Sequence, residues 1–492
     1  MPSSEPRDRP EPVPAGSPRA VVDAPEPGAN PVRPLARLRP FAARLQPGDP
    51  LVIPSPPRAG VARRRVAALL PALAAAGCAR FPELPVSDGG DPVVGDPLLQ
   101  EVTAGAPELP GNDVTSLWGG FRAFAALFRA IESARDHVNL EFYIFQDVSL
   151  PDHPAGPSLF ALLERKLRQG VAVTAIYDSL GSEDTPAAAF DALRAAGANL
   201  LSFNPVNPLE ARGGAWRPNA RDHRKILVVD GRVGVMGGVN LDRVYENACG
   251  RRPSEMPIED TDDACWTDVA IRVEGPAVAA LQRLFLDTWA KQGGGELPAR
   301  EWFPPLANRG RTAMRVLGSA PGEDRPLFYV ARLAEIAKAR DRIRLCTGYF
   351  VPTPREREEL ARAARRGVDV RLLLPSVTDT PLATHAQRAS YGELLDAGVR
   401  IFELRDSVLH AKVGVVDGAW SAVGSSNLDR RSVAWNNEVD AVLLGREVGA
   451  ALEAALERAM TRAAPVSLDR WRRRGVGQRL RELLSWPVTD LL

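Results

Sequence analysis

The sequence carries one pattern twice, first as Asp222-His-Arg-Lys-Ile-Leu-Val-Val-Asp-Gly231 and again as Leu409-His-Ala-Lys-Val-Gly-Val-Val-Asp-Gly418. In each copy a histidine precedes a lysine by two positions, and an aspartate follows the lysine by five. Ten positions after the aspartates stand Asn240 and Asn427. A frame of this length that occurs twice indicates a chain built as a tandem repeat.

The repetition continues upstream of both copies. Ala134–Phe145 in the first half has its counterpart in Ala339–Phe350 in the second. Within each half, apolar β-branched runs alternate with helical patterns, which is typical of an α/β fold. We therefore predict an α/β protein with two tandem repeats of an α/β/α sandwich, one over residues 113–300 and one over residues 301–464.

Each histidine and its lysine are expected to act together. Side chains two positions apart project to the same face of a strand, so His223 lies beside Lys225 and His410 lies beside Lys412. An ammonium group holds a phosphate oxygen as a point charge, while an imidazole attacks phosphorus or transfers a proton. One such pair is usually surface decoration, but this chain has only five histidines. Two pairs in one identical frame therefore predict a phosphodiester site.

The residues after each lysine predict a turn and further phosphate ligands. Asp230 and Asp417 each precede a glycine after a β-branched run, which is the signature of a hairpin turn. Small residues then let the main chain approach a ligand closely, and asparagine side chains supply neutral donors to phosphate oxygens. The residues expected to bind phosphate in this way are Gly238, Asn240, Ser425 and Asn427.

The doubled frame resembles the His-Lys-Asp motif of the phospholipase D superfamily. Within that superfamily the chain is most similar to bacterial cardiolipin synthases, through segments such as Gly237-Gly-Val-Asn-Leu-Asp242 and Asn427-Leu-Asp-Arg-Arg-Ser432. The resemblance covers residues 113 to 460 and implies one active site, shared by the two repeats, that transfers phosphatidyl groups in two steps without a metal or a cofactor. The catalytic residues that it implies are His223, Lys225, Asp230, His410, Lys412 and Asp417.

The resemblance also assigns a separate task to each histidine. It implies that His223 forms a phosphohistidine, while His410 protonates the departing alcohol and then deprotonates the incoming one. A catalytic imidazole needs its far nitrogen fixed by a carboxylate or a carbonyl. Glu438 matches the family position that pairs with the histidine of its own motif, His410, and Asp268 is the expected partner of His223. For both carboxylates, an ordinary exposed charge on a strand is the alternative.

The first 112 residues are expected to lie outside the repeats. Residues 1–60 hold 16 of the 44 prolines and no apolar period, so we predict a disordered extension. Within residues 61–112, Arg63-Arg-Arg65 and an apolar run precede Cys78, which resembles a bacterial lipoprotein signal with Cys78 as the lipidated residue. A basic amphipathic or buried helix is the alternative. No segment is long and apolar enough to predict a spanning helix.

Residues 465–492 form a second candidate for membrane attachment. Four arginines between Arg472 and Arg479 precede Leu480, Leu483 and Leu484, so a basic stretch ends in an apolar stripe. Such a segment can lie on an anionic bilayer with its arginines at the level of the headgroups. Packing of the same helix on the protein core is the alternative.

The composition limits the classes of binding partner that we expect. A net charge of +1 provides no field that would gather polyanions, so we expect no nucleic-acid partner. From the resemblance, we predict a membrane-associated bacterial enzyme that makes cardiolipin from phosphatidylglycerol and a second phospholipid, either phosphatidylglycerol or phosphatidylethanolamine. Three alternatives stay open. They are phospholipid hydrolysis by a phospholipase D reaction, lipid binding without catalysis, and a nuclease, which the superfamily also contains and which fits the near-neutral charge poorly.

Overall fold

A computed structural model describes the part of the chain that contains both motifs. The described residues are 102, 104–150, 158–207, 217, 219–246, 264–323 and 326–485. The predicted extension at residues 1–60 and the predicted lipid anchor at Cys78 lie outside these ranges.

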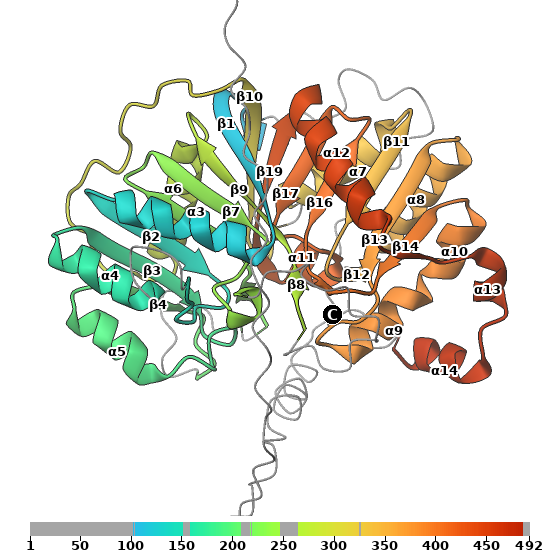
Figure 1. The fold of residues 1–492 in the computed structure, drawn as a ribbon, viewed down its shortest axis with the longest axis horizontal. Helices are drawn as coiled ribbons and strands as arrows, with labels where there is room; N and C mark the ends of the chain where they lie inside the picture. Colours follow the sequence, from blue (N-terminus) through green and yellow to red (C-terminus); the bar gives the residue numbers. More distant parts are fainter. Residues whose placement is uncertain are drawn as a thin grey trace, which may run out of the picture. The chain divides into compact units, whose positions relative to one another are not determined.

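The first repeat runs from strand β1 to helix α6 (Figure 1). In chain order its elements are β1 (Leu109–Trp118), α3 (Gly120–Ser133), β2 (His137–Phe142), α4 (Leu159–Arg168), β3 (Ala172–Asp178), α5 (Ala187–Ala195), β4 (Asn199–Phe203), β5 (Arg221–Asp222), β6 (Lys225–Val229), β7 (Val233–Gly237), the 3₁₀ helix η2 (Arg243–Tyr245), β8 (Trp266–Thr267), β9 (Val269–Glu274) and α6 (Val278–Lys291).

The second repeat runs from β10 to α12, and β20, α13 and α14 follow the repeat. In chain order the elements are β10 (Thr312–Ser319), α7 (Leu327–Lys338), β11 (Arg342–Cys346), β12 (Phe350–Val351), α8 (Pro354–Arg365), β13 (Asp369–Pro375), α9 (Pro381–Ala389), α10 (Tyr391–Asp396), β14 (Arg400–Leu404), β15 (Val408–Leu409), β16 (Val413–Val416), β17 (Trp420–Gly424), β18 (Leu428–Asp429), α11 (Arg430–Ala434), β19 (Asn436–Leu444), α12 (Arg446–Met460), β20 (Ala464–Pro465), α13 (Leu468–Arg472) and α14 (Val476–Ser485).

Both repeats contribute to one continuous sheet, joined by the antiparallel pair β1 and β10. Outward from this pair, the strands follow the order β1, β9, β7, β6, β2, β3, β4 on one side and β10, β19, β17, β16, β11, β13, β14 on the other. Equivalent strands therefore occupy equivalent places in the two halves. This mirrored order confirms the predicted α/β fold with two tandem repeats.

Helices pack on the sheet and bury its central strands (Figure 1). Strands β2 and β6 are buried along their whole length, as expected for strands that are covered on both faces. One apolar cluster crosses the boundary between the repeats, because it contains Val278 and Leu281 of α6 together with Leu452 and Leu456 of α12. The two halves of the sheet thus share a core, which holds their inner strands in fixed relative positions.

The predicted Asp-Gly hairpins join β6 to β7 and β16 to β17. The φ angles of Asp230 and Gly231 are 51° and 60°, and those of Asp417 and Gly418 are 51° and 63°. Two successive left-handed residues match the twist of the flanking strands, and aspartate and glycine adopt this conformation at low cost.

Candidate active site

Each motif histidine lies where the chain changes its strand partner. The predicted single strand through His223 is interrupted, because β5 ends at Asp222 and β6 begins at Lys225. Strand β5 pairs with β19 of the second repeat, whereas β6 pairs with β2 of the first. Around His410, β15 likewise pairs with β8 of the first repeat and β16 pairs with β11 of the second. Both histidines therefore stand at crossings between the repeats.

The two imidazoles face each other across one gap. The ring centroids of His223 and His410 are 6.5 Å apart, with the ring planes at 83°. The main-chain N–H of His223 donates to the carbonyl of Asn437 at 3.0 Å, and that of His410 donates to the carbonyl of Thr267 at 2.8 Å. Each histidine is thus held by the main chain of the opposite repeat. A group within about 3 Å of both rings fits between them.

Each imidazole is paired with a carboxylate of the opposite repeat. His223 Nδ1 lies 3.1 Å from both carboxylate oxygens of Glu438. His410 Nδ1 lies 2.6 Å from Asp268 Oδ2. The prediction that Glu438 serves the histidine of its own motif, and Asp268 that of the first, is therefore wrong, because the partners are exchanged.

The exchange follows from strand register. Asp222 of β5 lies opposite Asn437 of β19, so the next residues on the two strands, His223 and Glu438, are neighbours. The parallel pair of β8 and β15 has the equivalent register and brings the second histidine to its own carboxylate. The carboxylate strands thus follow one motif along the chain but serve the other motif in space.

Both imidazoles are biased towards the neutral form. Burial lowers the pKa of His223 well below its ordinary value, and the two motif lysines lower it further. Burial and Lys412 also lower the pKa of His410, although Asp268 opposes this shift. Of the two rings, His410 is therefore the one whose protonated form is stabilised by its carboxylate partner, Asp268.

The pKa values of the two carboxylates also differ between the half-sites. Burial raises the pKa of Glu438, although hydrogen bonds and Lys225 oppose the shift. Burial would also raise the pKa of Asp268, but His410 and Lys412 bring it below its ordinary value. Asp268 is thus the more firmly ionised partner.

The motif lysines lie beside their histidines, as predicted. Lys225 Nζ donates to the carbonyl of His223, and Lys412 Nζ donates to the carbonyl of His410. Burial lowers the pKa of Lys225 to about 7 and that of Lys412 to about 8. Near neutral pH each amine is close to its own titration point, so an anion bound beside it would favour the ammonium form.

The motif asparagines are held by their side-chain oxygens. Asn240 Oδ1 accepts from the main-chain N–H of Ile144 at 3.3 Å, and Asn427 Oδ1 accepts from that of Tyr349 at 3.2 Å. Both side chains are buried. Because the oxygen of each amide is anchored, its N–H₂ group lies on the other side of the amide and can donate to a ligand oxygen.

Gly238 and Ser425 support the carboxylates instead of offering donors to phosphate. The main-chain N–H of Gly238 donates to Val269 at 2.9 Å, and a Cβ at this glycine would come within 2.2 Å of Asp268 Oδ1. Ser425 Oγ donates to Glu438 Oε2 at 2.5 Å, and its main-chain N–H donates to a neighbouring strand. The expectation that these two residues bind phosphate directly does not fit these contacts, because their donors are occupied.

The motif aspartates lie at the far end of the strands that follow the lysines. The Asp230 carboxylate accepts from the main-chain N–H groups of residues 135, 136 and 137 at 2.8 to 2.9 Å. The Asp417 carboxylate accepts from those of residues 340, 341 and 342 at 2.9 Å. Both aspartates fix a hairpin turn to the start of a central strand. The expectation that these aspartates are catalytic therefore does not fit their contacts, which support the turn assignment.

Sequence reasoning missed Tyr245. Its hydroxyl donates to Asp268 Oδ2 at 3.0 Å and lies 3.0 Å from His410 Nδ1, and its side chain is 1% exposed. Burial raises the pKa of Tyr245 well above its ordinary value, so the phenol remains a neutral donor. Tyr245 ends the three-residue 3₁₀ helix η2, which is too short to show a periodic pattern, so no sequence signal pointed to it.

Aromatic rings form the walls around both imidazoles. Tyr143 lies edge-on to His223 with 5.4 Å between centroids. Trp266 and Tyr349 lie 5.5 Å and 6.2 Å from His410 by the same measure. These rings restrict solvent around the histidines and strengthen the electrostatic interactions inside the gap.

Two α/β repeats that bring two His-x-Lys pairs to one gap define a phospholipase D-like protein. The family model described as "Cardiolipin synthase, PLD-like domain" matches residues 127–252 and 333–460. The cardiolipin synthase of Geobacillus thermodenitrificans (strain NG80-2) is 32% identical over 379 residues, covering 76% of this chain and 72% of that protein. The cardiolipin synthase of Listeria monocytogenes serotype 4a (strain HCC23) is 31% identical over 395 residues, covering 80% and 78%. The chain belongs to the family of phospholipase D-like cardiolipin synthases.

A solved structure supports the fold. The crystal structure of phosphatidylserine synthase from Haemophilus influenzae Rd KW20 has a TM-score of 0.58 to this chain and covers 80% of it and 99% of its own length. The two sequences are 12% identical, so this similarity concerns the fold alone.

Proposed function

We propose that this chain is a phosphatidyltransferase that makes cardiolipin from phosphatidylglycerol and a second phospholipid through a phosphohistidine. The observation that carries the proposal is the pair of imidazoles 6.5 Å apart, each with a carboxylate on its Nδ1 and a lysine at its side. Because Nδ1 of each ring is occupied, Nε2 is the atom left for the substrate. The identity to curated cardiolipin synthases supports the choice of lipid.

In the first step, Nε2 of His223 attacks the phosphorus of phosphatidylglycerol. The bond from phosphorus to the headgroup oxygen breaks, and protonated His410 gives its proton to that oxygen, so that glycerol leaves. The lowered pKa of His223 supports this order, because a neutral ring has a free lone pair. The ionised Asp268 supports the complementary role of His410, because it stabilises an imidazolium.

In the second step, His410 acts as the base. It takes the proton from the headgroup hydroxyl of a second phosphatidylglycerol, and the resulting oxygen attacks phosphorus and releases His223. The glycerol of the acceptor then carries one phosphatidyl group on each of its two terminal oxygens, and both imidazoles return to their starting forms. With phosphatidylethanolamine as the donor, ethanolamine leaves in place of glycerol.

Four donors are placed to stabilise charge on the phosphorus-bound oxygens. They are the ammonium groups of Lys225 and Lys412 and the amide groups of Asn240 and Asn427. Such preorganised donors are usually the largest single contribution to catalysis, since they need no reorganisation as charge develops. The site is symmetric in these donors, as is expected if one phosphorus lies between the two histidines.

The substrates lie in a bilayer, so the protein acts at a membrane surface. None of the helices in the described ranges is long and apolar enough to cross a bilayer. We propose a peripheral association in a bacterium, with a lipid at Cys78 and the basic C-terminal segment as two weak anchors. Two such signals together give stable attachment where one alone is reversible.

The test is to incubate the purified protein with detergent micelles that contain phosphatidylglycerol and to resolve the lipid and alcohol products. Cardiolipin with an equal amount of glycerol is the expected result. Phosphatidic acid with glycerol would show that water is the acceptor and that the protein is a hydrolase. The absence of any turnover would favour the alternative of lipid binding without catalysis. Addition of phosphatidylethanolamine, with detection of free ethanolamine, then identifies the second lipid.

A further inference from the structure

The C-terminal helix α14 exposes its apolar face. Val476, Leu480, Leu483 and Leu484 are 82%, 53%, 62% and 66% exposed. Their spacing of four, seven and eight positions places them along one stripe of the helix. These are among the most exposed large apolar side chains in the described part of the chain.

Two polar side chains of α14 face the protein instead, whereas Arg479 and Arg481 are exposed. Glu482 and Ser485 are buried, and Gln478 donates to Glu482 Oε1 at 3.0 Å. Arg474 forms an ion pair with Glu482 at 2.9 Å and so ties the helix to the preceding segment. A helix of a water-soluble surface normally has the opposite arrangement, with its apolar stripe on the core. The inverted arrangement indicates that the apolar stripe has an external partner.

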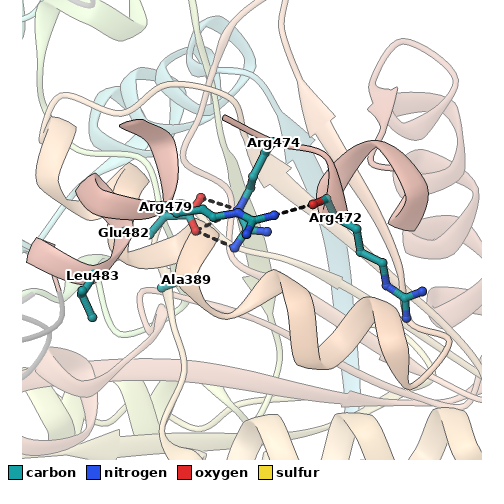
Figure 2. A pocket seen from close by; sticks show the side chains of 6 residues that line it. All are labelled: Ala389, Arg472, Arg474, Arg479, Glu482 and Leu483. Atoms are coloured by element: carbon teal, nitrogen blue, oxygen red, sulfur yellow. Dashed lines mark hydrogen bonds and ion pairs between the residues drawn. The ribbon is translucent and has the colours of Figure 1, made fainter. Parts of the chain in front are cut away.

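Arginines surround the apolar stripe. Arg472, Arg474 and Arg479 line a hollow of about 440 Å³ whose other walls include Leu483 of the stripe (Figure 2). Arg479 donates to the main-chain oxygen of Arg472. The side chain of Arg472 is 64% exposed and forms an ion pair with Asp396 at 2.6 Å. Glu482 also lines the hollow, so its lining carries three arginines and one carboxylate. Leucines next to a basic hollow are complementary to a surface that is apolar inside and anionic at its edge, which describes an anionic phospholipid bilayer.

The stripe lies near the active site. Helix α14 packs on α9, and α9 packs on β12. Strand β12 directly follows Tyr349, whose ring lies edge-on to His410. In Figure 1, α9, α14 and β12 occupy the same end of the second repeat.

We propose that α14 docks the protein onto anionic phospholipid bilayers and presents the active site to lipid. The leucines enter the boundary between headgroups and acyl chains, and the arginine hollow takes a lipid phosphate. This docking rests on the proposed function, which includes the basic C-terminal segment as a membrane anchor, and assigns that role to named residues. The surface itself is defined by the residues of α13, α14 and α9.

The test is flotation of the full-length protein with vesicles of phosphatidylcholine, with and without phosphatidylglycerol. Every protein compared carries Cys78→Ser, which removes any lipid at that residue. The double variant Leu480→Glu, Leu483→Glu is expected to bind vesicles with phosphatidylglycerol at least about tenfold more weakly. Arg472→Gln is expected to weaken binding about fivefold on these vesicles and to leave binding to pure phosphatidylcholine unchanged.

Phe303→Glu is the matched control. Phe303 is 43% exposed and precedes Pro304, and a Cβ at the hairpin glycine Gly231, at the end of β6 away from His223, would come within 2.6 Å of Pro304. This variant should bind vesicles like the parent, and thermal unfolding of the leucine variant should match that of the parent because its changes are exposed. Unchanged vesicle binding by the leucine variant would overturn the proposal. Conversion of a dimer to a monomer by that variant, with vesicle binding intact, would also overturn it and assign the stripe to a second copy of the chain.

Separate experiments test the membrane docking and the proposed reaction. Turnover of phosphatidylglycerol in micelles by the parent protein measures the chemistry without a bilayer. A parent that docks on vesicles but turns over no lipid in micelles would support the docking surface and contradict the proposed reaction.

Discussion

The two halves of the active site have the same parts in different surroundings. The His223 half-site consists of His223, Lys225 and Glu438. Here Glu438 accepts from Ser425 Oγ at 2.5 Å and from Asn436 Nδ2 at 3.1 Å, and burial nevertheless raises its pKa.

The His410 half-site consists of His410, Lys412 and Asp268. Here Asp268 accepts from the Tyr245 hydroxyl at 3.0 Å and from the main-chain N–H of Val269 at 2.7 Å. Its pKa is lowered by its histidine and lysine against the effect of burial.

The comparison teaches that a symmetric motif supports an asymmetric reaction. The sequence frame makes the two histidines equivalent, whereas the carboxylates make them different. An ionised partner stabilises an imidazolium, and a partner with a raised pKa does so less. The His410 half-site is therefore suited to hold a proton, and the His223 half-site is suited to supply a nucleophile.

The largest decreases in kcat are expected from changes to the motif lysines, which both half-sites share. Lys225→Met and Lys412→Met should each lower kcat by about 10²- to 10³-fold, because each removes a charge from the oxygens of the transition state. The measurement is steady-state cardiolipin formation in micelles. The control is Lys338→Met, which removes the ion pair of that lysine with Glu335 on α7. A lysine variant with normal kcat would break the symmetry that we infer.

The carboxylates should separate the half-sites. Asp268→Asn is expected to lower kcat about 10²-fold, because it removes the charge that stabilises the His410 imidazolium. Glu438→Gln should lower kcat about tenfold, since Glu438 mainly orients a neutral ring. Asp230→Asn is the control, because Asp230 lies in a hairpin turn and should affect thermal stability more than kcat. The reverse order of the two active-site variants would exchange the assigned roles.

The lysines also predict a pH dependence. Their pKa values are lowered to about 7 and about 8, so each is an ammonium below its pKa and a neutral amine above it. The attraction for phosphate is therefore present at lower pH and lost as pH rises. In the free enzyme, kcat/KM should fall about tenfold per pH unit between the two pKa values and up to about a hundredfold per pH unit above both, because both lysines then lose their charge. A profile of kcat/KM that stays flat to about pH 9 would contradict charged lysines as phosphate ligands.

The smallest effect is expected from Tyr245→Phe. Loss of one hydrogen bond to the Asp268 and His410 pair should lower kcat about fivefold. KM should stay unchanged, because Tyr245 acts through Asp268 and does not touch the substrate. Steady-state kinetics over a range of phosphatidylglycerol concentrations separates the two constants. A change confined to KM would instead place Tyr245 in substrate binding.

Much of the fold could be predicted because it is encoded locally and twice. The β-branched runs, the Asp-Gly turns at Asp230 and Asp417, and the repeated order of segments are all short-range signals. The break in the strand at His223 was not predictable in this way. It arises because β5 and β6 pair with strands of different repeats, and no local pattern records such a change of partner.

The same reason explains the errors within the site. The histidines, lysines and asparagines could be found from their spacing. The exchange of Glu438 and Asp268 between the half-sites depends on the register of β5 with β19 and of β8 with β15. Such pairing between distant segments is decided by the packing of the two repeats, and proximity along the chain suggests the opposite partner.

The most direct measurement uses a phosphatidyl ester of p-nitrophenol, whose leaving group departs without a proton. With this substrate His410→Ala should release a burst of nitrophenol and keep the phosphatidyl group on His223, seen by intact mass spectrometry and peptide mapping. His223→Ala should give no burst and no adduct. A covalent lipid on His410, or its absence from both histidines while turnover continues, would contradict the account.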